Sequence, residues 1–266
     1  MMQTVRIGEL EYLTADNIAV PHGFTTRLGG VSRGHLASLN LGMNRGDDPE
    51  NVVQNYRILT EAIGCTVDDL VLTHQTHSDI ILPATQDEAG KSLDHRLWPE
   101  CDARITNVPG VALVAFTADC TPVLLHDPVT GAVAAIHAGW RGTAQNIVGK
   151  TVKAMADTYG CKPENIRAAI GPNIAQCCFE TDADVPQAML ETYGNPAEAH
   201  IRTAGEKFYV NLKEINALAL RQTGVTDIQI SPLCTVCQSH RFWSHRVHGN
   251  DRGSQGAIIL CKGVMP

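Results

Sequence analysis

Two short apolar runs, each leading into a side chain that can bind a metal or attack a substrate, constrain this chain most. Residues 111–117 lead into Asp119 and Cys120, and residues 132–137 end at the imidazole of His137. Runs of this length are too short for helices and predict buried strands. Residues 122–126 and 132–137 flank a Pro- and Gly-containing segment that predicts a hairpin turn. Such a hairpin brings Cys120 and His137 toward one another.

The composition is that of an ordinary globular protein. Of 266 residues, 44% are hydrophobic and 18% charged, and the net charge is −7. This acidic balance argues against a dedicated nucleic-acid-binding protein. No run approaches the roughly 20 apolar residues that span a bilayer, and the first residues lack the apolar segment of a secretion signal. Nine irregularly spaced cysteines indicate a reduced chain rather than a disulfide framework. We therefore expect one cytoplasmic domain over residues 1–266, without nucleic-acid or membrane partners.

Strands and helices are predicted to mix without strict alternation. Asp48, Pro49 and Gly64 predict the two ends of a helix over residues 49–63. Further helices are expected over residues 143–159, 181–193 and 212–222, and a polar surface segment over residues 86–102. The remaining strands are expected over residues 71–77, 80–82, 166–170, 226–230 and 257–260. This pattern favours an α+β fold, in which helices flank mixed sheets, over a doubly wound parallel sheet.

One thiolate and two imidazoles form a plausible zinc ligand set. Three protein ligands leave the fourth tetrahedral position open for water or substrate, as in catalytic zinc sites. Besides Cys120 and His137, the third ligand is expected from the segment that contains His74 and His77. If that segment is a strand, residues three apart point to opposite faces, so only one of the two histidines reaches the site. Each residue alone also fits an ordinary core, and the spacing does not choose between His74 and His77.

Several motifs closely resemble the signatures of the YfiH-like, laccase-domain purine nucleoside phosphorylase family. The resemblance runs in order from about residue 24 to residue 260. The motifs are residues 26–30 (TRLGG), 38–42 (SLNLG), 75–77 (QTH), 117–122 (TADCTP), 137–142 (HAGWRG), 170–172 (IGP) with 178–180 (CFE), and 244–246 (SHR). The resemblance implies a sandwich-like core of the cysteine-hydrolase type. It also implies His77, Cys120 and His137 as zinc ligands, which selects His77 over His74.

The resemblance implies an activity as well: zinc-dependent phosphorolysis of adenosine, inosine, guanosine and methylthioadenosine, together with adenosine deamination. The substrates would be purine nucleosides and phosphate. Cys120, His137 and Asp119 are the candidate catalytic residues, with Asp119 as an orienting partner or proton carrier. Phosphate requires cationic contacts. The candidates for substrate binding are Arg27, Arg141 and Arg246 for the anion and Asn40 for ribose, although each could instead serve the structure.

Three other functions remain open. The family's older name suggests a copper-dependent polyphenol oxidase, because two His and one Cys can form a blue-copper centre. A trinuclear copper cluster, however, commonly needs His-x-His pairs, which this sequence lacks. Cys120 with His137 as base would instead give a thiol hydrolase acting on amide bonds, consistent with the family's reported link to peptidoglycan editing. A non-enzymatic nucleoside-binding protein is the last possibility.

Two further cysteine motifs are predicted to pack rather than to react. Cys234 and Cys237 have Cys-x-x-Cys spacing, but no second such pair accompanies them, and the context is not thioredoxin-like. Cys177 and Cys178 are expected in the core.

Overall fold

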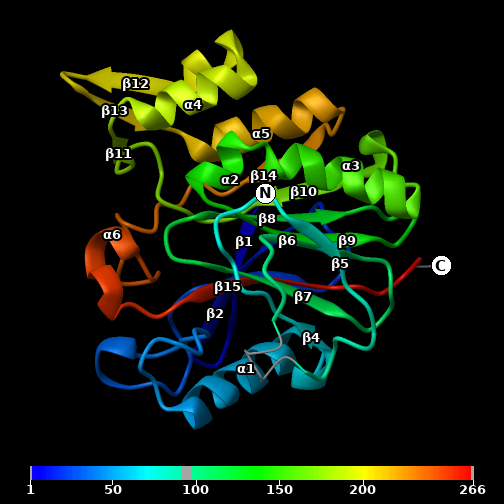
Figure 1. The fold of residues 1–266 in the computed structure, drawn as a ribbon. Coiled ribbons are helices and arrows are strands. Elements are labelled where there is room, and N and C mark those ends of the chain that lie inside the picture. Colours follow the sequence, from blue (N-terminus) through cyan, green and yellow to red (C-terminus); the bar gives the residue numbers. More distant parts are fainter. Residues whose placement is uncertain (1, 92–97, 265–266) are drawn as a thin grey trace.

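Two mixed six-stranded sheets form the centre of the molecule, and a three-stranded sheet lies beside them (Figure 1). The structure, a computed structural model, describes residues 2–91 and 98–264. In the first sheet the strands lie in the order β1 (Met2–Ile7), β2 (Leu10–Ala15), β3 (His22–Thr25), β15 (Gln255–Leu260), β7 (Ala112–Thr117) and β4 (Leu70–Val71). In the second the order is β14 (Asp227–Ile230), β10 (Arg167–Ile170), β8 (Thr121–His126), β9 (Val133–Ala138), β6 (Ala103–Thr106) and β5 (Ile81–Pro83). The third holds β11 (Glu180–Thr181), β13 (Lys207–Val210) and β12 (Ile201–Ala204).

Helices cover the outer faces of the two large sheets. The helices are α1 (Pro49–Ile63), α2 (Trp140–Ala144), α3 (Ile147–Tyr159), α4 (Asp184–Tyr193), α5 (Leu212–Thr223) and α6 (His245–His248). Short 3₁₀ turns are η1 (Gly34–Leu36), η2 (Val67–Asp69), η4 (Pro163–Asn165), η5 (Asn195–His200) and η6 (Gly249–Asp251). Helix α1 packs on the first sheet, whereas α3 and α5 pack on the second (Figure 1). Among the described residues, no helix is both long and apolar enough to cross a bilayer.

The two large sheets pack face to face, and this packing explains the apolar runs of the sequence. In β8, Leu124 belongs to the cluster between the sheets, whereas Val123 and Leu125 belong to the cluster beneath α3. Successive strand residues point to opposite faces, so a strand buried on both faces is apolar throughout. The predicted α+β class with a sandwich-like core is therefore confirmed.

The predicted helix over residues 49–63 is confirmed as α1. The side chain of Asp48 accepts a hydrogen bond from the backbone N–H of Glu50 at 2.9 Å, and Gly64 closes the helix in the left-handed conformation at φ 80°. The predicted helix over residues 143–159 is present as α3 from residue 147 onward, but the prediction is wrong in its first turn. Asn146 has φ 56° and separates α2 from α3, and its side chain caps α3 at the N–H of Gly149.

Two other expectations fail near the site. The predicted strand over residues 71–77 is wrong beyond Val71, where β4 ends. Among the residues that the structure describes, only His74 of this segment forms a further bridge, to Glu100. The predicted surface segment over residues 86–102 is wrong at its end, where Cys101 and Asp102 are buried. Residues 92–97 of that segment lie outside the described residues.

Acid should destabilise the protein through His126, at the end of β8. The ring is 1% exposed, and neither nitrogen has a hydrogen-bond partner among the described residues. Burial lowers the pKa of His126 to about 4, whereas an unfolded chain binds this proton near pH 6.5. The contribution of His126 to stability is therefore full above about pH 6.5 and falls as the pH drops toward 4, by up to about 3 kcal/mol.

Urea unfolding of wild type and a His126→Leu variant at about pH 7 and about pH 4.5 measures this effect. His22, whose pKa burial also lowers, is present in both proteins and cancels in the comparison. We expect the wild type to lose more of its unfolding free energy than the variant. Equal losses would rule His126 out as the cause.

Candidate active site

Three side chains from separate segments converge at one end of the sheet sandwich. Cys120 lies in the tight connection between β7 and β8, and His137 lies in β9 opposite Pro122 of β8. His77 comes from the irregular segment that follows β4. One potential ligand atom from each residue lies within 4.8 Å of those of the other two. The structure therefore brings together the three residues that the family resemblance singles out.

The spacing of these atoms fits one tetrahedral metal ion. His77 Nε2 lies 3.7 Å from Cys120 Sγ, and the His77 and His137 rings meet edge to face at 4.9 Å between centroids. Nitrogen and sulfur ligands of tetrahedral zinc lie about 3.5 Å apart, given bonds of about 2.0–2.1 and 2.3 Å. Among the described residues, no fourth His, Cys, Asp or Glu joins the group. Such a set leaves one coordination position to a ligand from outside the protein.

Asp102 orients His137. Its Oδ1 lies 2.7 Å from His137 Nδ1, and both side chains are buried. Although burial opposes ionisation, hydrogen bonds from His137 and Ser78 lower the pKa of Asp102 to about 2. An ionised carboxylate only accepts hydrogen bonds, so Nδ1 of His137 carries the proton and Nε2 is left to act as a ligand.

The same carboxylate shapes the segment around His77. Asp102 accepts hydrogen bonds from the backbone N–H groups of Thr76 at 3.2 Å, His77 at 3.1 Å and Ser78 at 2.7 Å, and from the Ser78 hydroxyl at 2.6 Å. His77 adopts a left-handed conformation, with φ 62°. The chain turns around Asp102 instead of continuing as a strand, so strand alternation does not apply to His74 and His77. Asp102 was not predicted as a site residue, because it lies in the segment expected at the surface.

His74 lies outside the cluster. Its Nδ1 faces Glu100 Oε1 at 3.7 Å, in an exposed pair near the rim of the pocket.

Cys120 and His137 shift one another's pKa values. Burial alone would raise the pKa of the thiol and lower that of the imidazole, but their mutual attraction and hydrogen bond outweigh it. The pKa of Cys120 falls to about 6, and that of His137, which Asp102 also supports, rises to about 9. Without a metal, the pair favours thiolate and imidazolium near neutral pH. A divalent cation would have to displace the proton of His137.

Gly139 follows His137 because the cluster leaves no room for a side chain. A Cβ at this position would lie 2.8 Å from His77 Cδ2 and 3.2 Å from Cys120 Sγ. Gly139 is also the N-cap of α2, whose first residue, Trp140, lines the pocket. The first glycine of the HAGWRG motif is therefore explained by the close approach of the backbone to the candidate ligands His77 and Cys120.

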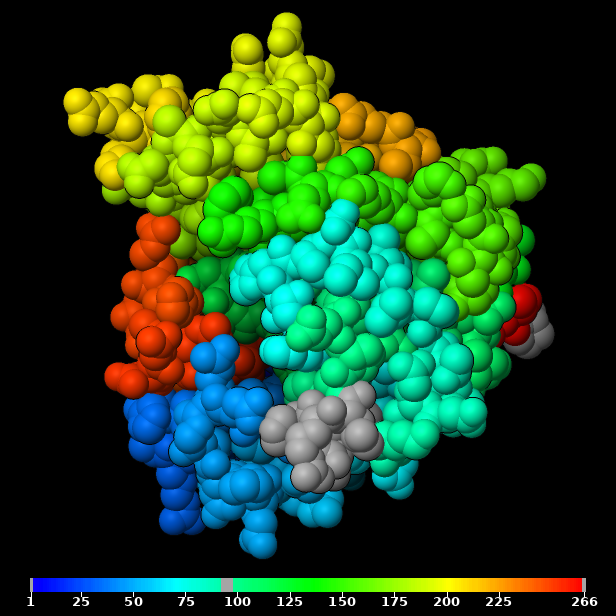
Figure 2. Space-filling view, in the orientation of Figure 1, coloured from blue at the N-terminus to red at the C-terminus, as the bar shows by residue number. Residues whose placement is uncertain are grey.

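The cluster opens into a pocket of about 650 Å³. Figure 2 shows this hollow between the light-blue and cyan segments near residues 45 and 75 and the orange-red segment near residue 245. Its volume lies within the range typical of small-molecule sites. Aromatic side chains form much of the wall: Trp98, Phe116, Trp140 and Phe179.

Two half-buried arginines that the sequence analysis did not select line the pocket, Arg45 and Arg252. Burial and then repulsion from Arg45 lower the pKa of Arg252 to about 10, while Cys120 and Asp119 oppose this shift. The Nε of Arg252 has no hydrogen-bond partner among the described residues. Two guanidinium groups that line one pocket and repel one another, one of them with an unused N–H donor, suit the binding of an anion. Neither arginine stands in a motif or spacing that signals this role.

Three of the residues predicted to contact substrate are not among those that line the pocket. Arg27 stacks on Trp243 at 3.8 Å and donates to the carbonyl of Ala37. Asn40 is fully buried, and its amide binds Asp47 and the backbone N–H groups of Gly42 and Ser254. Arg141 is exposed and stacks on the ring of Trp140, its neighbour. Their contacts with substrate stay predictions, and the contacts observed hold loops in place.

Asp119 and Arg246 do line the pocket, and they contact one another. The Asp119 carboxylate accepts from Thr235 Oγ1 at 2.6 Å, Ser244 Oγ at 3.0 Å and the backbone N–H of Arg246 at 2.7 Å. The Arg246 guanidinium donates to the carbonyl oxygens of Cys178 and Glu180. These contacts fasten the C-terminal loop beside Cys120, whereas Asp102 is the carboxylate that binds His137.

Comparison with known proteins shows the family to which this chain belongs. The family described as multi-copper polyphenol oxidoreductase laccase matches residues 21–262. A Deinococcus radiodurans protein named purine nucleoside phosphorylase is 38% identical over 250 residues, which cover 94% of this chain and 92% of that protein. Purine nucleoside phosphorylase YlmD of Bacillus subtilis is 33% identical over 265 residues, 98% of this chain and 94% of that one. The crystal structure of YlmD from Geobacillus stearothermophilus matches with a TM-score of 0.91 at 32% identity, covering 97% of this chain and 98% of that one.

The packed sheets and the cluster at their end define an α+β protein with a candidate His–Cys–His metal site. This chain belongs to the laccase-domain family that includes YfiH and YlmD. The family resemblance and the fold class expected from the sequence are both confirmed.

Proposed function

We propose that this protein is a zinc-dependent purine nucleoside phosphorylase that cleaves adenosine, inosine, guanosine and methylthioadenosine and also deaminates adenosine. The observation that carries the proposal is the joining, in one pocket, of a three-ligand cluster and a pair of arginines. The names of the relatives support the phosphorolytic reaction.

His77, Cys120 and His137 would hold the zinc ion, and their atom spacing fits it. When bound, zinc would supply Lewis acidity beside the substrate. We favour zinc over copper because the chain lacks the His-x-His pairs of a trinuclear copper centre. Asp102 would keep His137 in the ligating tautomer.

Arg45 and Arg252 would bind phosphate. Guanidinium groups match the geometry of phosphate oxygens and remain charged at neutral pH. The free Nε of Arg252 and the repulsion between the two groups favour an anion between them. Phosphate bound there would lie near the cluster, since Cys120 acts on the charge of Arg252.

The purine would lie against the aromatic wall. Phe116, Trp140 and Phe179 offer flat apolar surfaces on which a base can stack. Their shape complements any purine, which is consistent with the range of nucleosides proposed. Their closeness to the cluster would hold the glycosidic bond next to the bound phosphate.

A second function, thiol hydrolysis of amide bonds, is favoured by one observation. Without metal, the pocket contains a thiolate on Cys120 that interacts with the imidazolium of His137. The carboxylate of Asp102 in turn orients His137. The two functions differ in their need for metal. Chelation should abolish phosphorolysis, whereas it should expose the thiolate and increase hydrolase activity.

The test is to mix the purified protein with adenosine and phosphate, then to measure adenine, ribose 1-phosphate, inosine and hypoxanthine. We expect ribose 1-phosphate in an amount equal to adenine plus hypoxanthine, inosine in addition, and loss of all products on chelation. Zinc added back should restore the products. Adenine with free ribose would indicate hydrolysis, and activity that survives complete removal of metal would contradict the proposal.

Replacing Arg252 by Gln should raise the KM for phosphate by about 10- to 100-fold, because a charge-assisted hydrogen bond contributes about 1.5–3 kcal/mol. Binding of nucleoside in the absence of phosphate should change little. The control is Arg221→Gln, an exposed arginine on α5 that faces Glu214. Steady-state kinetics over a series of phosphate concentrations measure the KM, and an equilibrium titration with nucleoside alone measures nucleoside binding. An unchanged KM for phosphate would remove Arg252 from the anion site.

A further inference from the structure

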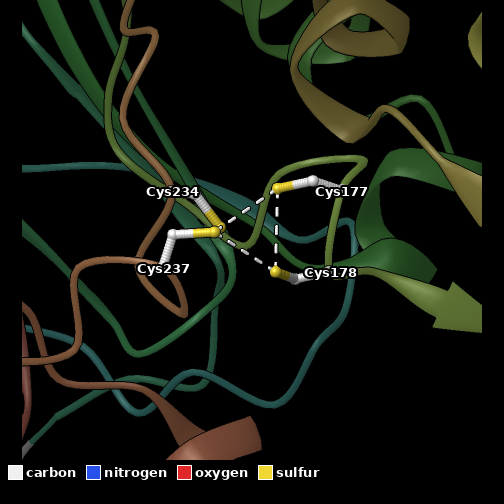
Figure 3. A group of neighbouring side chains, drawn as sticks. All are labelled: Cys177, Cys178, Cys234 and Cys237. Atoms are coloured by element: carbon white, nitrogen blue, oxygen red, sulfur yellow. Dashed lines mark hydrogen bonds between the residues drawn. The ribbon is translucent and has the colours of Figure 1, made fainter.

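Four cysteines from two loops gather outside the pocket. Cys177 and Cys178 lie in the turn between β10 and β11, and Cys234 and Cys237 lie in the turn that follows β14. Figure 3 shows the four sulfur atoms pointing toward one another from the two loops. The sulfur atoms all lie within 4.8 Å of one another. The expectation that Cys177 and Cys178 lie in the core is wrong, since Cys177 is exposed and Cys178 half-buried.

The distances between the sulfurs match a tetrahedral metal site. Cys177 and Cys178 are 3.6 Å apart, and Cys237 lies 3.7 Å from Cys177 and 3.5 Å from Cys178. A zinc ion with bonds of about 2.3 Å to four thiolates separates those thiolates by about 3.8 Å. A disulfide would need a separation of about 2.05 Å, and all four thiols are free. The cluster is therefore nearly prearranged for one ion.

The backbone of both loops supports Cys234. Its Sγ accepts a hydrogen bond from the N–H of Ala175 at 3.4 Å, and the N–H of Thr235 binds the carbonyl of Asn173 at 2.9 Å. The backbone N–H groups of Cys237 and Val236 also interact with this sulfur. N–H groups directed at the first sulfur of a Cys-x-x-Cys turn stabilise a thiolate, the form that binds metal.

Positive charge lies beside the cluster. Lys213 is 4% exposed, and its Nζ donates to the carbonyl oxygens of Ser231 and Leu233, both at 2.7 Å. Its charge interacts with Cys234 and Cys177. Four thiolates around one divalent ion carry a net charge of −2, which a nearby ammonium partly offsets. This buried lysine is an observation independent of the sulfur geometry, and it favours a negatively charged group at this place.

We propose that Cys177, Cys178, Cys234 and Cys237 form a second, structural zinc site. Four protein ligands close the coordination sphere, so this site would hold the two loops together and bind no substrate. The joined loops flank the pocket, because Thr235 binds Asp119 at 2.6 Å and Arg246 binds the carbonyl of Cys178. The site is separate from the His77 cluster and does not depend on the function proposed for that cluster.

Metal content tests this site directly. Wild type, a Cys177→Ser/Cys237→Ser variant and the control Cys65→Ser are purified with reductant and zinc, and zinc per chain is measured by mass spectrometry. Cys65 is a half-buried free thiol that belongs to neither group. We expect the double variant to hold one zinc ion fewer per chain than wild type and the control. Equal zinc content in all three proteins would overturn the proposal.

A measurement on the unaltered protein covers the case in which the double variant does not fold. Wild type loaded with ¹¹³Cd should give a resonance in the region of four-thiolate coordination. That resonance should persist in a His137→Ala variant, which separates this site from the pocket cluster. Absence of the resonance from wild type, iron in place of zinc, or a disulfide between the loops in zinc-loaded reduced protein would each contradict the assignment.

Discussion

Replacement of His137 by Ala is expected to empty the pocket cluster of metal and to abolish phosphorolysis. The change removes one of three protein bonds to the ion. Zinc affinity should therefore fall by more than the roughly 10- to 100-fold that follows the loss of a residue that hydrogen-bonds a ligand. It also leaves the buried carboxylate of Asp102 without its imidazole partner. Competition with a chromophoric chelator measures the affinity, and the nucleoside assay measures the activity.

His74→Ala is the matched control for this variant. His74 also lies near the pocket, but its imidazole faces Glu100 rather than the cluster. We expect zinc affinity and activity to stay near those of wild type. Loss of metal and activity from His74→Ala, or full zinc binding by His137→Ala, would show that the ligand set is wrong.

Replacement of Asp102 by Asn is the second change with a large expected effect. The amide accepts through one oxygen only, whereas the carboxylate accepts from His137 Nδ1 and from backbone N–H groups of residues 76–78. Zinc affinity should fall by about 10- to 100-fold, because neither His137 nor His77 would be held in its ligating position. The free energy of unfolding without metal should fall by about 2–4 kcal/mol, as buried donors lose a charged acceptor.

Asp79→Asn is the control for Asp102. Asp79 is close in sequence to His77, but its carboxylate forms a partly exposed ion pair with Lys150. Such pairs contribute at most about 1 kcal/mol, so this variant should retain both zinc affinity and stability. Isothermal titration with zinc and urea unfolding in chelator measure the two effects separately. Wild-type values for Asp102→Asn in both experiments would refute the orienting role.

Local patterns in the sequence predicted much of the architecture. Residues 111–117, 122–126 and 132–137 are mostly apolar because both faces of their strands are buried, and a turn with Pro and Gly joins the last two. Asp48, Pro49 and Gly64 mark the ends of α1 by local capping chemistry. These features depend on neighbouring residues, so one sequence is enough to predict them.

Long-range contacts determine the features of the site that could not be predicted from the sequence. Strand alternation could not choose between His74 and His77, because the segment that contains them is not a strand. Its backbone N–H groups bind the carboxylate of Asp102, a residue about 25 positions further along the chain. The family resemblance selected His77 where local reasoning could not. Arg45 and Arg252 line the same pocket although they are far apart in the sequence and share no motif.

The cysteine cluster shows the same limit. Cys234 and Cys237 alone are half of a metal site, and Cys177 and Cys178 precede them by 57 and 59 residues along the chain, respectively. Each motif alone is a weak signal in the sequence, and only the fold brings the two together.

Anomalous X-ray diffraction at the zinc edge, from crystals of zinc-loaded protein, tests the central claim most directly. The account predicts an anomalous peak in the pocket about 2.0–2.3 Å from His77 Nε2, Cys120 Sγ and His137 Nε2, with the fourth ligand supplied by solvent or substrate. Absence of a peak among these three residues, or a fourth protein ligand that closes the site, would contradict it.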